Sequence, residues 1–178
     1  MKSNRNASAK TVLMDTLEQL LHKKAFQKIS VNELCETALV SRSAFYANFE
    51  DKYHLLACCL ESKTAEIDIL METHSPREFL SVILDFIQKE NRFFYNTFGA
   101  ELDPELLEIL YAFFEGHLTL FLSGRISEGL TLPVPAEVMS SFYVGGLSST
   151  TLRWIKSNYK LPKEELAAYQ CRLLRGIL

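Results

Sequence analysis

Apolar side chains recur every three or four positions along most of the chain, the spacing of helices that bury one face. Residues 11–25 show this first, with four leucines on one face: Leu13, Leu17, Leu20 and Leu21. A second apolar stripe predicts a helix over residues 51–72. The sequence lacks the apolar-polar alternation that marks a half-buried strand. The pattern therefore predicts an all-α protein with eight or nine helices.

Start and stop signals predict further helices in the second half of the chain. Ser75 can cap a helix that has Pro76 at its first position and Glu78 at its third. Gly99 can end that helix near residue 98. Similar signals predict helices over residues 103–127, over residues 135–158, and from residue 162 to the C-terminus.

Two short helices joined by a tight turn are predicted between residues 29 and 49. Ser30 and Glu33 form an S-x-x-E capping box, in which each side chain can satisfy a backbone donor at the helix start. Ser41 can cap a second helix, over residues 42–47, that begins with small and polar residues. This arrangement is typical of a helix-turn-helix, which places the start of its second helix in the major groove of DNA.

The same segment resembles the DNA-binding domain of the TetR family of one-component transcriptional regulators. The matching stretches are Ser30, Ala38-Leu39-Val40-Ser41, Tyr46-Ala47-Asn48-Phe49 and Asp51-Lys52. Leu39 stands where the family usually has Gly, and Asn48 where it often has His. A leucine is strained if the turn needs a positive φ, so we expect a slightly reshaped turn.

The resemblance implies a DNA-binding domain over residues 1–52 and a helical effector-binding and dimerisation domain over residues 53–178. Arg42 is expected to read a guanine edge through two hydrogen bonds, with Ser43 and Ala44 close to base edges. The side chains expected to contact phosphates are Ser30, Tyr46, Asn48 and Lys52. Since a two-fold dimer reads two half-sites, the expected DNA partner is a palindromic or near-palindromic operator.

The distribution of charge agrees with this division. The net charge is −3, but residues 1–52 contain eight Lys or Arg against six Asp or Glu, and the remainder contains eleven against sixteen. The predicted DNA-binding end is therefore weakly basic, and the rest of the chain is acidic.

Aromatic residues are dense after residue 75, and core packing is the simplest explanation for each one. In the family, however, the middle helices of this half enclose a pocket for a small, mostly apolar molecule, with a few polar groups to orient it. The predicted effector-pocket residues are Phe86, Phe94, Tyr95, Tyr111, Phe114, His117 and Tyr143. For His117 taken alone, a partly buried histidine with an ordinary partner is the simpler interpretation.

Gly145 and Gly146 lie inside a regular helical pattern, where each glycine costs about 1 kcal/mol relative to alanine. Small residues allow another helix to approach closely, from the same chain or from a second subunit. In the family, the last two helices of each chain pair with those of a second chain in a four-helix bundle. The resemblance therefore predicts a homodimer with six candidate interface residues: Gly145, Gly146, Ser149, Leu166, Tyr169 and Leu173.

Other functional classes find little support in the sequence. His54 and Cys58 share a helix face but supply only two ligands, fewer than a metal site needs. The four cysteines are interpreted as structural thiols, with redox sensing as the alternative. The sequence shows no paired carboxylates, nucleophile triad or phosphate loop, so we expect no enzymatic activity, metal or cofactor. The longest apolar run, residues 109–114, is far short of a membrane span, and no signal peptide is recognised, so a cytoplasmic protein without a membrane partner is expected.

Together these features predict a ligand-responsive homodimeric repressor that a small, mostly apolar effector releases from its operator. Effector binding is expected to shift the helix that follows the helix-turn-helix and to change the spacing of the two reading heads. The alternative is a TetR-like coactivator or interaction protein that works with another regulator. The combination of Arg42, Tyr46 and Lys52 on one surface argues against that alternative.

Overall fold

The computed structural model describes residues 8–70, 75–99 and 103–174, and within these residues the protein has nine α-helices and no strand. The helices are α1 (Ala9–Leu21), α2 (Val31–Ala38), α3 (Arg42–Tyr46), α4 (Lys52–Leu70), α5 (Pro76–Lys89), α6 (Asn91–Phe94), α7 (Pro104–Ser127), α8 (Ala136–Lys156) and α9 (Lys163–Leu174). A short 3-10 turn, η1 (Phe26–Lys28), follows α1, and a π-helical turn, η2 (Tyr95–Gly99), follows α6. The all-α prediction is confirmed.

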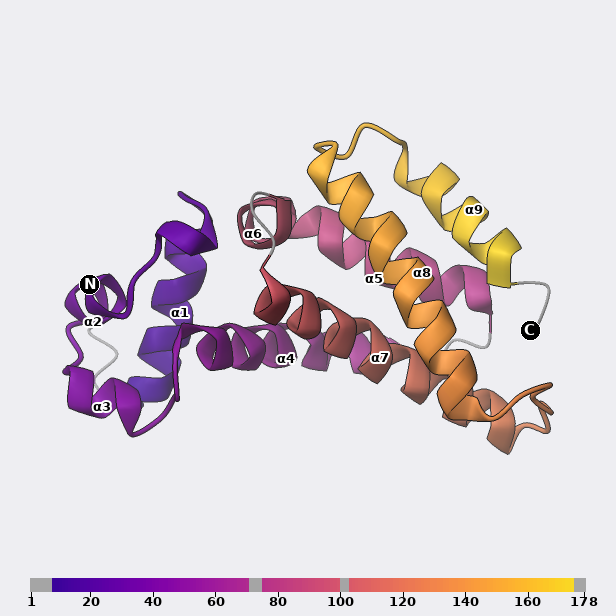
Figure 1. Cartoon of the computed structure of the whole chain (residues 1–178), viewed down its shortest axis with the longest axis horizontal. Helices are drawn as coiled ribbons and strands as arrows, with labels where there is room; N and C mark the ends of the chain where they lie inside the picture. The colour runs from indigo at the N-terminus through magenta and orange to yellow at the C-terminus, as the bar shows by residue number, and fades with distance from the viewer. Residues whose placement is uncertain (1–7, 71–74, 100–102, 175–178) are drawn as a thin grey trace.

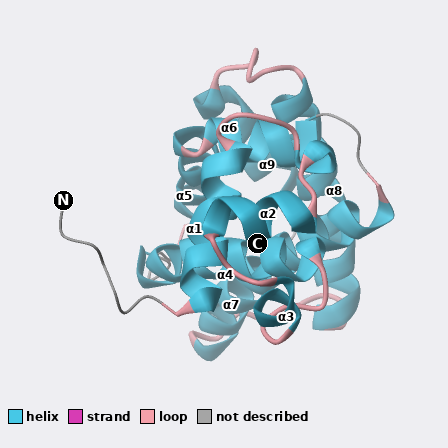
Figure 2. Cartoon of the chain, turned by 90° about the vertical axis from the view of Figure 1, so that its left-hand side faces the viewer, coloured by secondary structure: helices cyan, strands magenta, loops and turns pink. Residues whose placement is uncertain are grey.

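The helices form two parts that are joined by α4 (Figure 1). Helices α1, α2 and α3 gather at one end of the molecule, which we call the head, and α5 to α9 make up the larger body. Helix α4 packs on α1 in the head and on α5 and α7 in the body. In Figure 2, which views the molecule from the head, α2 and α3 lie in front of the body helices.

All three helices of the head and the η1 turn bury apolar side chains, which form one end of the continuous core of the protein. The buried side chains of the head include Leu13, Leu17, Leu21, Phe26, Ile29, Leu34, Phe45 and Phe49. The Ser30 hydroxyl accepts a hydrogen bond from the Glu33 backbone N–H at 3.2 Å, as the capping box predicts. The Glu33 carboxylate binds the Lys24 ammonium at 2.5 Å, so an ion pair takes the place of the second half of the box.

Two predicted helices end earlier than expected. Helix α1 stops at Leu21 rather than residue 25, because the chain turns to bury Phe26 and Ile29. The helix predicted over residues 75–98 is interrupted at Glu90, where φ is −94° and ψ is 32°. That break allows three aromatic side chains to be buried together: Phe93, Phe94 and Phe98.

The remaining helix boundaries are close to prediction. Helices α7, α8 and α9 lie within the ranges 103–127, 135–158 and 162 onward that the sequence indicates. The predicted end of α4 at residue 72 and that of α9 at the C-terminus fall outside the described residues.

The turn between α2 and α3 keeps the left-handed geometry that usually requires glycine. Leu39 has φ 55° and ψ 38°, and its side chain is 94% exposed. The backbone N–H of Val40 donates to the carbonyl of Cys35 at 3.0 Å, a Schellman closure of α2. The backbone N–H of Leu39 also donates to the carbonyl of Glu36 at 3.3 Å. The expected reshaping of the turn is therefore wrong, because these two hydrogen bonds hold the leucine in a conformation that costs it about 1–2 kcal/mol.

The body is organised around α7, which packs against α4 and α8, while α5 packs against α9. By length and composition alone α7 could span a membrane, and its most apolar window covers 18 residues. Of that window 44% is buried inside the protein. Leu110, Phe114, Leu118 and Leu122 are among the buried side chains of α7, which is therefore a core helix of the body.

Candidate nucleic-acid interface and effector cleft

Helix α3 presents its polar residues outward because one apolar side chain anchors it. The Ser41 hydroxyl caps α3 by accepting a hydrogen bond from the Ala44 backbone N–H at 3.1 Å. Phe45 is fully buried, and its ring meets the ring of Phe49 at 5.7 Å. Arg42 and Ser43 are exposed at the start of the helix, and the predicted base contact Ala44 is partly buried.

Neighbouring side chains hold the Arg42 guanidinium in place. Its Nη1 donates a hydrogen bond to Oδ1 of Asn32 at 2.8 Å. Its central carbon lies 5.8 Å from the centroid of the Tyr46 ring, a cation–π contact one helical turn away. The i, i+4 spacing of Arg42 and Tyr46 is visible in the sequence, whereas Asn32, on α2, was missed because only the packing of α2 on α3 brings it close.

Three of the predicted phosphate contacts lie on the outside of the head. Ser30, Tyr46 and Asn48 are exposed. The Ser30 hydroxyl caps α2, and Nδ2 of Asn48 donates to the Ala44 carbonyl at 2.7 Å. Tyr46 is 51% exposed, which leaves its hydroxyl accessible to a ligand. These positions are compatible with contacts to DNA, and their roles stay predictions.

Lys52 is held differently. Its ammonium donates to the carbonyls of Phe26 and Ile29 at 3.2 and 3.1 Å and lies 4.5 Å from the centroid of the Phe26 ring. Burial lowers the pKa of Lys52 below its ordinary value, although Asp103 and Glu105 act in the opposite direction. In this structure the lysine ties the η1 turn to the start of α4, so its predicted phosphate contact would have to compete with these bonds.

Asp103, at the start of α7, links the head to the body. One of its carboxylate oxygens accepts hydrogen bonds from Gln27 Nε2 at 2.6 Å and from the Tyr53 hydroxyl at 2.7 Å. The other caps α7 by accepting from the Leu106 backbone N–H at 2.9 Å. Burial alone would raise the pKa of Asp103, but these hydrogen bonds and the nearby Lys52 ammonium hold it below the usual range.

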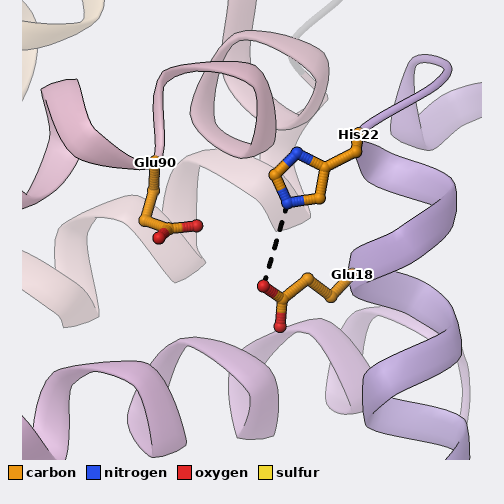
Figure 3. A group of neighbouring side chains, drawn as sticks. All are labelled: Glu18, His22 and Glu90. Atoms are coloured by element: carbon orange, nitrogen blue, oxygen red, sulfur yellow. Dashed lines mark ion pairs between the residues drawn. The ribbon is translucent and has the colours of Figure 1, made fainter.

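A second link between head and body is an ion-pair cluster. Figure 3 shows Glu18 of α1 and His22, which follows that helix, near Glu90 at the junction of α5 and α6. Their ligand atoms lie within 4.8 Å of one another. That grouping could hold a metal ion by distance alone. However, the Lys63 ammonium of α4 lies 2.5 Å from the Glu18 carboxylate and 3.2 Å from that of Glu90, so the lysine already supplies the positive charge.

Helices α4 and α7 enclose an open cleft of about 680 Å³. Its apolar lining includes Leu60 from α4 and Ile109, Phe113 and Leu120 from α7. Its polar lining consists of Glu61 and Thr64 from α4 and Glu108 and His117 from α7. A cavity of this size is in the range that holds small ligands.

Only one of the seven predicted effector-pocket residues, His117, lines this cleft. Its ring meets the ring of Phe113 edge-on at 4.8 Å. Phe86 and Phe94 pack on each other at 5.5 Å, and Phe114 is buried. Tyr95 is 39% exposed and Tyr111 is partly buried.

Tyr143 is buried on α8, and its hydroxyl has no hydrogen-bond partner among the described residues. Burial raises its pKa.

The cleft residues that the sequence missed, such as Glu61 and Glu108, carry no signal of their own, because only the pairing of α4 with α7 makes them neighbours.

The predicted dimer-interface residues lie mostly on an open face of α8 and α9. Gly146, Ser149, Tyr169 and Leu173 are exposed, Gly145 is partly exposed, and Leu166 is buried. A Cβ atom added to either glycine would meet nothing within 4 Å, so no contact within the described residues explains them. Two further large apolar residues of α8 are exposed, Val138 by 59% and Phe142 by 74%, and neither was predicted as an interface residue.

Comparison with known proteins agrees with this geometry. Residues 13–59 match the family described as bacterial regulatory proteins of the tetR family, and residues 74–176, more than half of the chain, match a transcriptional regulator C-terminal region. The Transposon Tn10 TetC protein of Escherichia coli is 33% identical over 61 residues, which are 34% of this chain. That match spans only 31% of the TetC protein.

Solved structures share the fold along nearly the whole chain. The dihydroxyacetone kinase operon activator DhaS is 18% identical, with a TM-score of 0.63 and 94% of each chain covered. A TetR transcriptional regulator from Streptococcus agalactiae is 20% identical, with a TM-score of 0.64 and 93% of each chain covered. With the family matches over both the head and the body, the chain belongs to the TetR family of transcriptional regulators.

Proposed function

We propose that this TetR-family regulator binds a palindromic operator as a homodimeric, cytoplasmic repressor and leaves it when a small effector enters the body. The observation that carries the proposal is the exposed Arg42 at the start of α3, held by Asn32 and Tyr46. A guanidinium fixed in this way loses little side-chain entropy when it meets a guanine edge, so its hydrogen bonds contribute more fully to specificity.

The open face of α8 and α9 supports a second subunit. Phe142 and Leu173 are 74% and 71% exposed, which is unusual for large apolar side chains on neighbouring helices of a monomer. The open space next to Gly145 and Gly146 leaves room for a helix from a partner chain. A two-fold dimer formed there presents two α3 helices to two half-sites.

The position of α4 supports control by a ligand. One face of this helix lines the cleft through Leu60 and Glu61, while its first turn is bound to the head through Lys52 and to Asp103 through Tyr53. A molecule that separates α4 from α7 therefore changes the position of the head. Because both heads must fit one operator, a small rotation of each weakens binding. We propose no catalytic activity and no cofactor for this chain.

The experiment that tests the proposal is a gel shift with the DNA upstream of the protein's own coding sequence. Retarded DNA that is released by unlabelled specific competitor, and is no longer retarded by the Arg42→Ala variant, supports the proposal. A chain that retards no DNA at any salt concentration would instead be the TetR-like interaction protein that works through another regulator. A reporter gene under the same upstream DNA gives the direction of control, since the similar DhaS is described as an activator.

A further inference from the structure

Two acidic side chains line the cleft between α4 and α7, one on each wall. Glu61 contributes a carboxylate from the α4 wall, and Glu108 contributes one from the α7 wall. Among the described residues, no lysine or arginine lines the cleft. Both glutamates are exposed, and neither forms an ion pair or side-chain hydrogen bond within the described part of the chain. Within the described part of the chain, no basic side chain neutralises either of these two negative charges.

Thr64, which also lines the cleft, is uncharged and does not offset this charge. The Thr64 hydroxyl donates a hydrogen bond to the Glu61 backbone carbonyl at 3.1 Å, so its proton is not available to donate to a ligand. The His117 ring packs edge-on against Phe113 at 4.8 Å. Ionised carboxylates only accept hydrogen bonds, so the polar side of the cleft favours a ligand group that donates or carries positive charge.

The apolar groups lie on the same walls as the carboxylates. Leu60, Ile109 and Phe113 offer hydrocarbon and aromatic surface that is partly or fully shielded from water. Because Glu61 and Glu108 are exposed, they lie at the open side of the cleft, where a charged group can stay partly hydrated. This arrangement matches a molecule with an apolar body and one cationic end.

We infer that the cleft selects an organic cation, such as an aromatic or alkyl amine or quaternary ammonium compound, and disfavours carboxylates of the same shape. This inference rests on the proposed function, because it names the chemical class of the effector for the proposed ligand site. A cleft lined by charges of one sign raises the local concentration of counter-ions and repels ions of its own sign. Residues 53–178, with eleven Lys or Arg against sixteen Asp or Glu, reinforce that preference.

The test uses three probes with the same apolar body and different ends: trimethyl(3-phenylpropyl)ammonium, 4-phenylbutanol and 4-phenylbutyrate. Isothermal titration calorimetry on the full-length protein, without DNA and at fixed ionic strength, measures each affinity. The cation is expected to bind most tightly and the carboxylate least. Equal affinities for the three probes, or tightest binding of the carboxylate, would overturn the inference, as would the absence of binding by any probe.

Two variants assign the preference to the named carboxylates. Glu61→Gln and Glu108→Gln should each lower the affinity for the cation by about threefold, and the double variant by about tenfold, as expected for partly exposed ion pairs. Binding of the alcohol should stay unchanged. Glu115→Gln is the matched control, because Glu115 is exposed on α7 and does not line the cleft. An equal loss of affinity in the control would overturn the assignment.

The outcomes separate this inference from the proposed function. If the wild-type protein binds its operator but shows no preference among the probes, the inference fails and the repressor proposal stands. If the protein binds no DNA, the repressor proposal fails, whatever the calorimetry shows.

Discussion

The head and the body arrange their candidate functional residues in different ways. In the head, the predicted DNA contacts come from one short stretch of sequence, and Arg42 and Ser43 project outward because Phe45 anchors α3 from behind. In the body, the cleft is built from α4 and α7, two helices that lie far apart in the sequence. Local geometry thus sets the head's surface, whereas long-range packing sets the cleft.

The head and the body are joined by apolar packing as well as by polar links. Their buried side chains belong to one continuous apolar core, and α1 contacts α6. The polar links include the hydrogen bond of Gln27 in the head to Asp103 in the body and the ion pair of Glu18 in the head with Lys63 of α4. Links of this kind break at small displacements, because a hydrogen bond weakens steeply with distance and angle. Under the proposed function, a ligand that displaces α4 at the cleft would change these links before it changed the reading surface of the head.

The largest expected effect comes from breaking the proposed interface of the body. Gly146→Leu should leave the monomer folded, because a Cβ there meets nothing within 4 Å, but it should separate the subunits by overpacking. Operator affinity should fall by about 100-fold or more, because a single head binds without the avidity of the pair. Analytical ultracentrifugation and a gel shift measure both quantities. Ser123→Leu, on an exposed position of α7, is the control. If the Gly146→Leu protein is still a dimer, the subunit interface lies on another surface.

The next effect concerns the head alone. Arg42→Ala should weaken binding to a selected operator by about 1–3 kcal/mol for each bidentate pair of hydrogen bonds that it removes, with no change in melting temperature. The arginine is exposed, so its removal leaves no cavity. Fluorescence anisotropy measures the binding of wild type and variant to two DNA duplexes. One is the operator, and the other is the same operator with a substitution at the base pair that Arg42 reads. Arg77→Ala, exposed on α5 in the body, should have no such effect. Unchanged affinity after Arg42→Ala would remove the arginine from the reading surface.

A third change tests the link between the two regions. Asp103→Ala removes two side-chain hydrogen bonds and the cap of α7, and should lower the free energy of unfolding by about 2–3 kcal/mol. Asp103→Asn, which retains a capping oxygen, should lower it less. Chemical denaturation of both variants measures the difference.

The same link predicts a dependence on pH. Because the pKa of Asp103 is lowered in the folded protein, its contribution to stability is present above the ordinary aspartate pKa of about 3.9. That contribution disappears as the pH falls through the lowered folded value. The stability difference between the wild type and Asp103→Ala should therefore shrink at acidic pH. A difference that grows as the pH falls would contradict the stabilising role of the ionised carboxylate.

The contrast between head and body also explains what the sequence could predict. The capping residues Ser30 and Ser41 act within three positions of themselves, so their hydrogen bonds were predictable. Helix starts at Pro76 and Pro104 follow from the same local rules. The break at Glu90 was not predictable, because it is favoured by the burial of aromatic residues against other helices.

Of the predicted effector-pocket residues, only His117 lines the cleft between α4 and α7, and long-range packing is again the reason. Aromatic residues such as Phe86, Phe94 and Phe114 serve equally well in a core or around a ligand, and nothing local distinguishes the two uses. His117 lines the cleft, but its neighbours there come partly from α4. Lys52 was predicted to contact a phosphate. Its long, flexible side chain instead reaches two backbone carbonyls of the head, which the local sequence does not reveal.

A smaller effect separates the two possible roles of Lys52. Lys52→Ala should lower the free energy of unfolding by about 1–2 kcal/mol, because two carbonyls lose a charged donor. If the lysine also reaches a phosphate, the variant should weaken binding to all sequences alike and reduce the salt slope by about one unit. Tyr46→Phe should weaken binding to all sequences without a loss of stability. A changed stability with an unchanged salt slope would make Lys52 a purely structural residue of the head.

The smallest effect concerns the turn of the head. Leu39→Gly should raise the free energy of unfolding by about 0.5–1 kcal/mol, because glycine adopts φ 55° without the steric penalty that leucine carries. The gain is smaller than the penalty of about 1–2 kcal/mol, since glycine also adds conformational entropy to the unfolded chain. Leu39→Ala is the matched control: it removes the same exposed side chain but retains a Cβ, so it should give no gain. If both variants stabilise the protein equally, the exposed leucine side chain rather than the left-handed backbone is the source of the cost. If Leu39→Gly also leaves operator affinity unchanged, DNA binding does not need the strained backbone of the turn at residue 39. The surface that contacts DNA then depends on α3 alone.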